Sequence, residues 1–233
     1  MDIQNSYRKI IEIMKNILEE IAARTRERIA KEKSCISVSE LENRIQEVNK
    51  NAGKRITLLQ ALQKDGMSYI CEVKKASPSK GLIAPDFPYL AIAKEYEQAG
   101  ASAISCLTEP FYFQGADQYL REISAAVQIP VLRKDFTVDE YMIYQAKSLG
   151  ASAVLLICAI LDDGELRAYR QLAKELGLDA LIEAHDEYEV DRVLNLGAEI
   201  VGVNNRDLRT FQVDMNNSCL LYTSDAADDL IGV

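Results

Sequence analysis

The sequence has no excess of positive charge. Its 233 residues include 27 Lys and Arg against 36 Asp and Glu, which gives a net charge of −9. A protein that binds a nucleic-acid backbone needs a basic surface, so this composition argues against nucleic acid as a partner. An anionic small molecule would need a local site built from a few residues.

Long apolar runs and paired cysteines are also missing. The first thirty residues are charged throughout, and no apolar run is long enough to span a bilayer. We therefore expect a cytoplasmic protein that is neither exported nor inserted into a membrane. The five cysteines contain no Cys-x-x-Cys spacing, so we expect no disulfide framework and no metal site.

Two helical stretches open the chain. From Tyr7 to about Lys31, apolar residues recur at helical spacing among many charged ones, which predicts an amphipathic helix. The stretch "SVSELENRIQEV" predicts a second helix, with Ser39 and Glu42 at the spacing of a capping box. We expect residues 1–66 to form an N-terminal helical extension.

After Gly66 the pattern becomes one of alternating strands and helices. Short apolar runs separated by helical patterns occur at 69–73, 102–107, 129–133, 152–157, 179–183 and 199–204. Three of these runs lie in similar phrases, "AGASAISCL", "LGASAVLLI" and "LGAEIVGVN". The glycine that precedes each run is typical of a helix end. Runs that are apolar on both faces indicate parallel strands covered by helices.

The fold class that follows is α/β. No G-x-G-x-x-G fingerprint is present, so a (β/α)8 barrel is favoured over an open doubly wound sheet. Six such runs are visible after Gly66.

Polar residues follow the apolar runs. In a parallel barrel the carboxyl ends of the strands form the active face. Side chains alternate along a strand, so Glu72 and Lys74 should point to the same side and influence each other's proton affinity. A charged residue at a strand end is also an ordinary solvated boundary, but four strand ends show the pattern together. The residues concerned are Glu72, Lys74, Lys75, Lys134, Asp135, Glu183, Asn204 and Arg206.

Three further features have two interpretations each. The phrase "SPSKG" is either a phosphate-binding loop or a plain turn. The aromatic residues of 109–115 either pack in the core or cover a ring-bearing substrate. His185, the single histidine, is interpreted as a local hydrogen-bonding residue and is left out of the site.

Six phrases stand out along the chain: "CEVKKASPSKG", "LTEPFYFQG", "PVLRKDF", "LLICAIL", "LIEAHDEYE" and "VGVNNRDLRTF". In these phrases and in their order, over about residues 7 to 217, the sequence resembles the indole-3-glycerol phosphate synthase family of tryptophan biosynthesis. The resemblance implies a (β/α)8 barrel that uses no cofactor or metal. It also implies that 1-(2-carboxyphenylamino)-1-deoxyribulose 5-phosphate is converted into indole-3-glycerol phosphate, carbon dioxide and water.

The resemblance also implies four catalytic residues. Lys134 matches the general acid that protonates the substrate carbonyl, and Glu183 matches a carboxylate held near the anilino nitrogen. Glu72 and Lys74 match a pair assigned to orientation and to the dehydration step.

Four substrate-binding residues follow in the same way. Ser77 matches a phosphate contact, and Phe113 matches an aromatic residue of the anthranilate pocket. Asn204 and Arg206 match contacts to the substrate hydroxyls and carboxylate, for which the planar guanidinium is suited. The implied partner is therefore a small phosphorylated substrate, and fusion to or association with other tryptophan-pathway enzymes is left open.

The resemblance stops after "FQVDMNN". The phrase "CLLYTSDAAD" is the translation of a DNA string that looks like a sequencing adapter, so we expect residues 218–233 to be a non-native tail. The point where the resemblance stops implies that residues 67–217 form an incomplete barrel of about six strands, because a parallel barrel closes only when its first and last strands pair. The alternatives to synthase activity are therefore a non-catalytic incomplete barrel, or a phosphoribosylanthranilate isomerase, which shares the fold.

Overall fold

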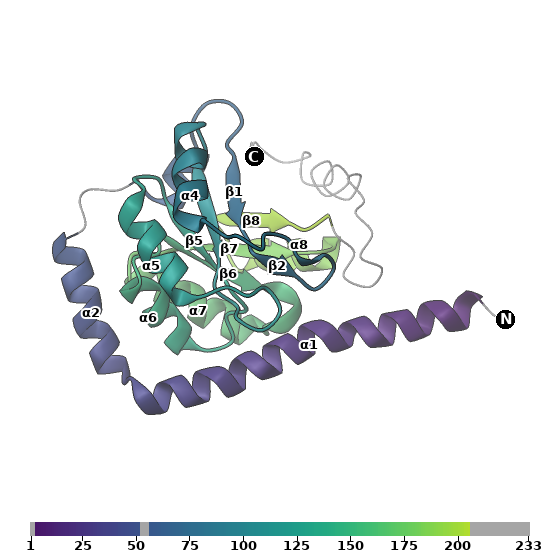
Figure 1. Cartoon of the computed structure of the whole chain (residues 1–233). Coiled ribbons are helices and arrows are strands. Elements are labelled where there is room, and N and C mark those ends of the chain that lie inside the picture. Colours follow the sequence, from purple (N-terminus) through teal and green to yellow (C-terminus); the bar gives the residue numbers. More distant parts are fainter. Residues whose placement is uncertain (1–2, 52–55, 206–233) are drawn as a thin grey trace.

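The computed structural model in Figure 1 describes residues 3–51 and 56–205, with side chains over 17–50 and 56–205. The predicted site residue Arg206 and the predicted tail at 218–233 lie outside the described residues.

Six parallel strands form one curled sheet whose spatial order follows the chain. They are β1 (Ile70–Val73), β4 (Ala103–Leu107), β5 (Val131–Lys134), β6 (Ala153–Ile157), β7 (Asp179–Ala184) and β8 (Ile200–Val203). Each lies within or next to a run expected to be a strand, and the curled half-barrel confirms the expected fold class. A short hairpin was not predicted: β2 (Ala76–Ser77) pairs with β3 (Gly81–Leu82) directly after β1.

Helices connect successive strands and cover the outer face of the sheet (Figure 1). Aspartates cap three of them, because Asp139, Asp162 and Asp186 each accept a hydrogen bond from a backbone N–H of the first turn. The helices are α4 (Tyr89–Gln98), α5 (Asp117–Ala126), α6 (Glu140–Ser148), α7 (Asp163–Glu175) and α8 (Glu187–Asn195), with a 3-10 turn, η1, at Cys158–Ile160.

The glycines of the three repeated phrases end helices as predicted. Gly100, Gly150 and Gly197 have φ values of 92°, 87° and 70°, in the left-handed region that other residues rarely adopt. Each glycine follows the C-cap of a helix and turns the chain toward the next strand, which gives all three βα units the same entry into the sheet.

The N-terminal extension is helical, as predicted, but its capping box is shifted. It consists of α1 (Ile3–Cys35), α2 (Val38–Asn51) and α3 (Leu58–Leu62). The Ser37 hydroxyl accepts a hydrogen bond from the Glu40 N–H, and the Glu40 carboxylate accepts one from the Ser37 N–H. The prediction of Ser39 and Glu42 was therefore wrong by two residues, because the helix begins at Val38 and Ser39 already lies inside it.

Alternation along the strands separates two apolar layers. Outward side chains such as Ile104 and Leu156 pack against the covering helices. Inward side chains such as Leu132 and Leu155 pack against Ile21 of α1. The long first helix therefore contributes to the interior of the curled sheet, while α2 packs beside α6 through Leu41, Tyr141 and Met142.

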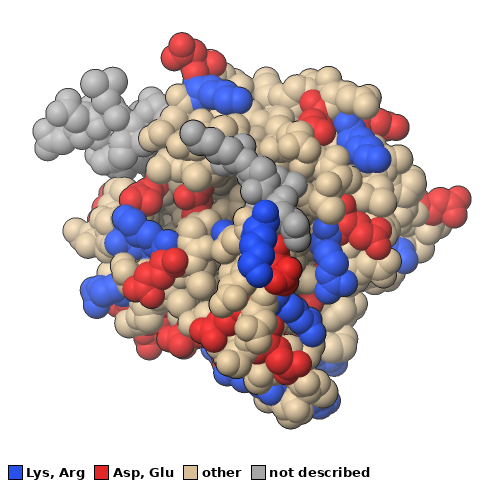
Figure 2. Space-filling view, turned by 90° about the vertical axis from the view of Figure 1, so that its left-hand side faces the viewer, with Lys and Arg blue, Asp and Glu red and all other residues tan. Residues whose placement is uncertain are grey.

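The face shown in Figure 2 has no large patch of one charge sign. Lys and Arg side chains there are interspersed with Asp and Glu. Over the described ranges, no helix combines the length and apolarity that crossing a bilayer requires.

Candidate functional site

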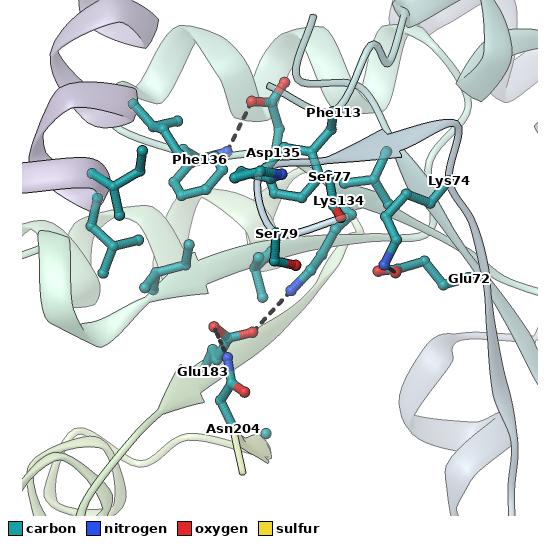
Figure 3. A pocket seen from close by; sticks show the side chains of 18 of the residues that line it. Glu72, Lys74, Ser77, Ser79, Phe113, Lys134, Asp135, Phe136, Glu183 and Asn204 are labelled. Atoms are coloured by element: carbon teal, nitrogen blue, oxygen red, sulfur yellow. Dashed lines mark hydrogen bonds and ion pairs between the residues drawn. The ribbon is translucent and has the colours of Figure 1, made fainter. Parts of the chain in front are cut away.

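A cavity of about 740 Å³ opens at the carboxyl ends of the strands. Seven of the eight predicted site residues line it, and the eighth, Arg206, lies outside the described residues (Figure 3). The shared location follows from the parallel sheet, because the carboxyl ends of all its strands meet at one edge. The seven are Glu72, Lys74, Ser77, Phe113, Lys134, Glu183 and Asn204.

Lys134 and Glu183 form the first ion pair of the cavity. Lys134 ends β5, Glu183 lies near the end of β7, and the ammonium nitrogen is 2.9 Å from Glu183 Oε2. The other oxygen, Oε1, accepts a hydrogen bond of 3.1 Å from the Asn204 side-chain amide. Asn204 is itself held by its backbone N–H, which donates to the Ala184 carbonyl at 2.9 Å.

Glu183 is held in its ionised form. Burial disfavours the charge, but the ammonium of Lys134 and the imidazole of His185 outweigh it and keep the pKa of Glu183 well below its usual range. A fixed anion in a partly enclosed cavity can stabilise positive charge that develops on a bound molecule.

Glu72 and Lys74 form a second ion pair in the same cavity. Their side chains are in direct contact and each is about one-third exposed, at 33% and 30%. Val73 lies between them and points into the outer core, so the alternation predicted from the sequence is confirmed. The cavity thus contains two separate Lys–Glu pairs, each with an ammonium group that can donate a proton and a carboxylate beside it.

The unpredicted hairpin shapes the side of the cavity next to the second pair. Ser77 is nearly buried at 8% exposure, and its hydroxyl accepts a hydrogen bond of 3.2 Å from the Lys80 N–H. Ser79 and Lys80 line the cavity as well. The phrase "SPSKG" is therefore a turn whose residues line the cavity, and phosphate binding by this turn stays a prediction.

Apolar side chains form the opposite wall. Phe113 and Phe136 lie 6.1 Å apart between ring centroids, and Ile17, Leu18 and Ile21 of α1 complete the wall. Of the aromatic residues at 109–115, only Phe113 lines the cavity. An aromatic ring of a ligand would find an apolar surface here, opposite the polar groups.

A buried carboxylate positions this aromatic loop. Glu109 is 1% exposed, and its oxygens accept hydrogen bonds of 2.9, 2.7 and 3.0 Å from the backbone N–H groups of Phe111, Tyr112 and Phe113. The loop is also tied to α1, since the Tyr112 hydroxyl donates to Glu20 at 2.5 Å. Sequence reasoning missed Glu109, although an acid just after a strand and before an aromatic run was a usable signal.

A second polar cluster lies beneath Lys134, and its contacts are not visible in the sequence. The Asp135 side chain is fully buried and accepts hydrogen bonds from Arg28 of α1 and from Thr108, at 3.0 and 2.7 Å. Burial disfavours its charge, but Arg28 and the nearby Arg133 keep the pKa of Asp135 below its ordinary value. This cluster connects α1 to the end of β5.

His185, predicted to lie outside the site, contacts it. Its Nε2 lies 3.4 Å from Glu183 Oε1, and its Nδ1 lies 3.0 Å from Glu189 Oε2. Burial opposes the charge, but the hydrogen bonds to the two carboxylates raise the pKa of His185 to about 9. The signal was its position two residues after Glu183, which puts both side chains on one side of the chain.

Within the part of the chain that the structure describes, no three His, Cys, Asp or Glu side chains come together in a way that could hold a metal ion.

A family model and several named relatives agree on one family. Residues 18–231 match the family model described as indole-3-glycerol phosphate synthase. A relative of that name from Ruminiclostridium cellulolyticum is 52% identical over 206 residues, covering 88% of this chain and 78% of the relative. A relative of the same name from Lacticaseibacillus paracasei is 53% identical, covering 88% of this chain and 78% of the relative. Another, from Endomicrobium trichonymphae, is 51% identical, covering 88% of this chain and 79% of the relative.

Proposed function

The chain belongs to the indole-3-glycerol phosphate synthase family, and we propose that its two Lys–Glu pairs divide the chemistry of that reaction between them. The enzyme is a carboxy-lyase of tryptophan biosynthesis. It converts 1-(2-carboxyphenylamino)-1-deoxyribulose 5-phosphate into indole-3-glycerol phosphate, carbon dioxide and water. This family assignment removes the support for the isomerase alternative.

Ring closure needs an acid at the substrate carbonyl. The ring carbon that bears the carboxylate attacks the ketone carbon, and the ketone oxygen must gain a proton as its π bond breaks. Lys134 is our general acid, because it ends a central strand and presents its ammonium to the cavity, 2.9 Å from a carboxylate that orients it.

Loss of carbon dioxide then restores the aromatic ring. The attack leaves the ring cationic, with positive charge shared by the anilino nitrogen, and the departing carboxylate leaves its electron pair to the ring. Glu183 would stabilise this positive charge, because Lys134 and His185 keep its carboxylate anionic and the Asn204 amide fixes its orientation.

Dehydration needs a second acid and a base. The hydroxyl formed in the first step leaves as water, and a proton is lost from the neighbouring carbon to complete the indole. Glu72 and Lys74 are suited to these two transfers, because they form a separate pair in the same cavity and are in contact with each other.

The remaining predicted residues would hold the substrate. Ser77, beside Ser79 and Lys80, offers hydroxyl and ammonium groups to the phosphate. Phe113 belongs to the apolar wall that suits the anthranilate ring, while Asn204 and Arg206 remain our predicted contacts to hydroxyls and carboxylate.

Cytoplasmic location, and fusion to or association with other pathway enzymes, also stay predictions.

The observation that carries this proposal is the meeting of two Lys–Glu pairs and an apolar wall around one cavity. Its test is the variant Lys134→Met, with formation of indole-3-glycerol phosphate followed by fluorescence. We expect kcat/KM to fall by about 10²-fold or more, the usual contribution of a general acid.

Lys75→Met is the matched control. Lys75 follows Lys74 directly but does not line the cavity, so its loss should change kcat/KM by no more than about twofold. A Lys134→Met protein that keeps its circular dichroism spectrum and its full activity would contradict the proposal.

A further inference from the structure

His185 is clamped between two carboxylates on different elements. Glu183 lies on β7 at 3.4 Å from Nε2, and Glu189 lies on α8 at 3.0 Å from Nδ1. The side chains of all three residues are nearly enclosed, with exposures of 13% for His185 and 14% for each carboxylate. The ring therefore has little freedom to turn away.

The chemistry of the two partners fixes the charge of the ring. An ionised carboxylate only accepts hydrogen bonds, and a neutral imidazole has only one N–H to donate. The Nδ1 contact with Glu189 is a hydrogen bond of 3.0 Å, and the Nε2 contact with Glu183 is an ion-pair contact of 3.4 Å. Both contacts are favourable together when the ring is the charged imidazolium. The geometry thus selects the imidazolium form.

The start of α8 holds the clamp in place. Asp186 caps this helix by accepting a hydrogen bond from the Glu189 N–H at 2.9 Å. The Glu189 carboxylate in turn accepts from the His185 backbone N–H at 2.8 Å as well as facing the ring. The ring is therefore oriented by a rigid helix terminus rather than by a mobile loop.

We propose that His185 is a positioning residue for Glu183: as an imidazolium anchored by Glu189, it holds one carboxylate oxygen so that the other faces Lys134. This inference rests on the proposed role of Glu183. Oε1 is shared by His185 and the Asn204 amide, while Oε2 is left to Lys134 at 2.9 Å. His185 itself does not line the cavity, so it acts through Glu183 and is not a catalytic residue.

The charged groups around His185 set the pH at which its ring loses a proton. Glu183 faces it from β7, Glu189 faces it from the start of α8, and Lys134 lies beyond Glu183 on β5. The two contacting carboxylates favour the proton on the ring, and loss of either should release it at lower pH.

The first test needs no enzymatic activity. His185 is the only histidine, so in the untagged full chain the imidazole NMR signals belong to this residue alone. We expect a titration midpoint of about 9, and a midpoint lower by roughly one pH unit or more in Glu183→Gln and in Glu189→Gln. Tyr188→Phe, at a 74% exposed position on the same helix, is the control and should leave the midpoint unchanged. A wild-type midpoint near the ordinary value, or one unmoved in Glu183→Gln, would overturn the inference.

The second test separates this inference from the proposed function. In His185→Gln we expect kcat to fall about tenfold with KM changed less than about threefold, and the acid limb of the pH–rate profile to move to higher pH, because Glu183 loses a neighbouring cation. Glu189→Gln should move only the alkaline limb, to lower pH. If Glu183→Gln keeps full activity, the proposed role of Glu183 fails. If Glu183→Gln is impaired but His185→Gln keeps the wild-type kcat and acid limb, only the inference about His185 fails.

Discussion

Arg28 of α1 and Asp135 at the end of β5 lie 107 positions apart in the sequence and form an ion pair in the interior. One guanidinium nitrogen of Arg28 is 3.0 Å from both carboxylate oxygens. The Asp135 side chain is fully buried and that of Arg28 is 11% exposed. The N-terminal extension is thus attached to the residue that directly follows Lys134.

Loss of Arg28 should destabilise the fold. In Arg28→Met the buried carboxylate keeps Arg133 and Thr108 as neighbours but loses its main counter-charge, which costs about 3 kcal/mol in comparable buried pairs. Urea unfolding near neutral pH measures the change. Lys33→Met is the matched control, because Lys33 lies on the same helix and pairs with Asp139 at the surface, where loss of an ion pair costs less than about 1 kcal/mol. Equal effects of the two substitutions would contradict this prediction.

Glu72→Gln should separate two steps of the reaction. If the Glu72–Lys74 pair serves dehydration, the variant should still release carbon dioxide but form indole-3-glycerol phosphate more slowly, by about 10²-fold. Rapid-mixing measurements of carbon dioxide and of indole fluorescence should then show a lag between the two products. Lys134→Met should slow both equally, and an equal slowing in Glu72→Gln would argue against the division of labour.

Glu109→Gln should loosen the aromatic loop. A glutamine places an NH₂ group against at least one of the three backbone N–H groups that the carboxylate now accepts, so Phe113 loses its fixed position. We expect KM to rise several-fold with a smaller change in kcat, together with a stability loss of about 1–2 kcal/mol. Glu95→Gln, at an exposed helical position, should change neither quantity. An unchanged KM in Glu109→Gln would show that the loop does not need this anchor.

The stability of the protein should depend on the charge of His185. Its folded-state pKa of about 9 lies above the ordinary value of 6.5, so its contribution is complete below pH 6.5 and is lost as the pH rises through about 9. The difference in unfolding free energy between wild type and His185→Gln should therefore be largest near pH 6 and shrink toward zero by about pH 10. A difference that stays constant over this range would mean that packing, rather than charge, stabilises the fold at this position.

The six strands and most of the site were accessible to sequence reasoning for physical reasons. Short runs that are apolar on both faces are typical of parallel strands covered by helices. Parallel strands bring their carboxyl ends to one edge of the sheet, where the polar residues meet. The pairing of Glu72 with Lys74 needed only the two-residue period of a strand. The same period, applied to Glu183, would also have brought His185 into the site.

The tertiary structure decided the contacts that cross elements. Lys134 and Glu183 face each other from β5 and β7, although β6 lies between these strands, because the sheet curls and its inward side chains converge. The same applies to Arg28 with Asp135 and to α1 in the cavity wall. The amino-acid pattern by itself determined which residues reach the strand ends, since alternation and helix-end glycines act over a few residues. Curvature and helix packing act over the whole chain, and they alone determined which of those residues meet.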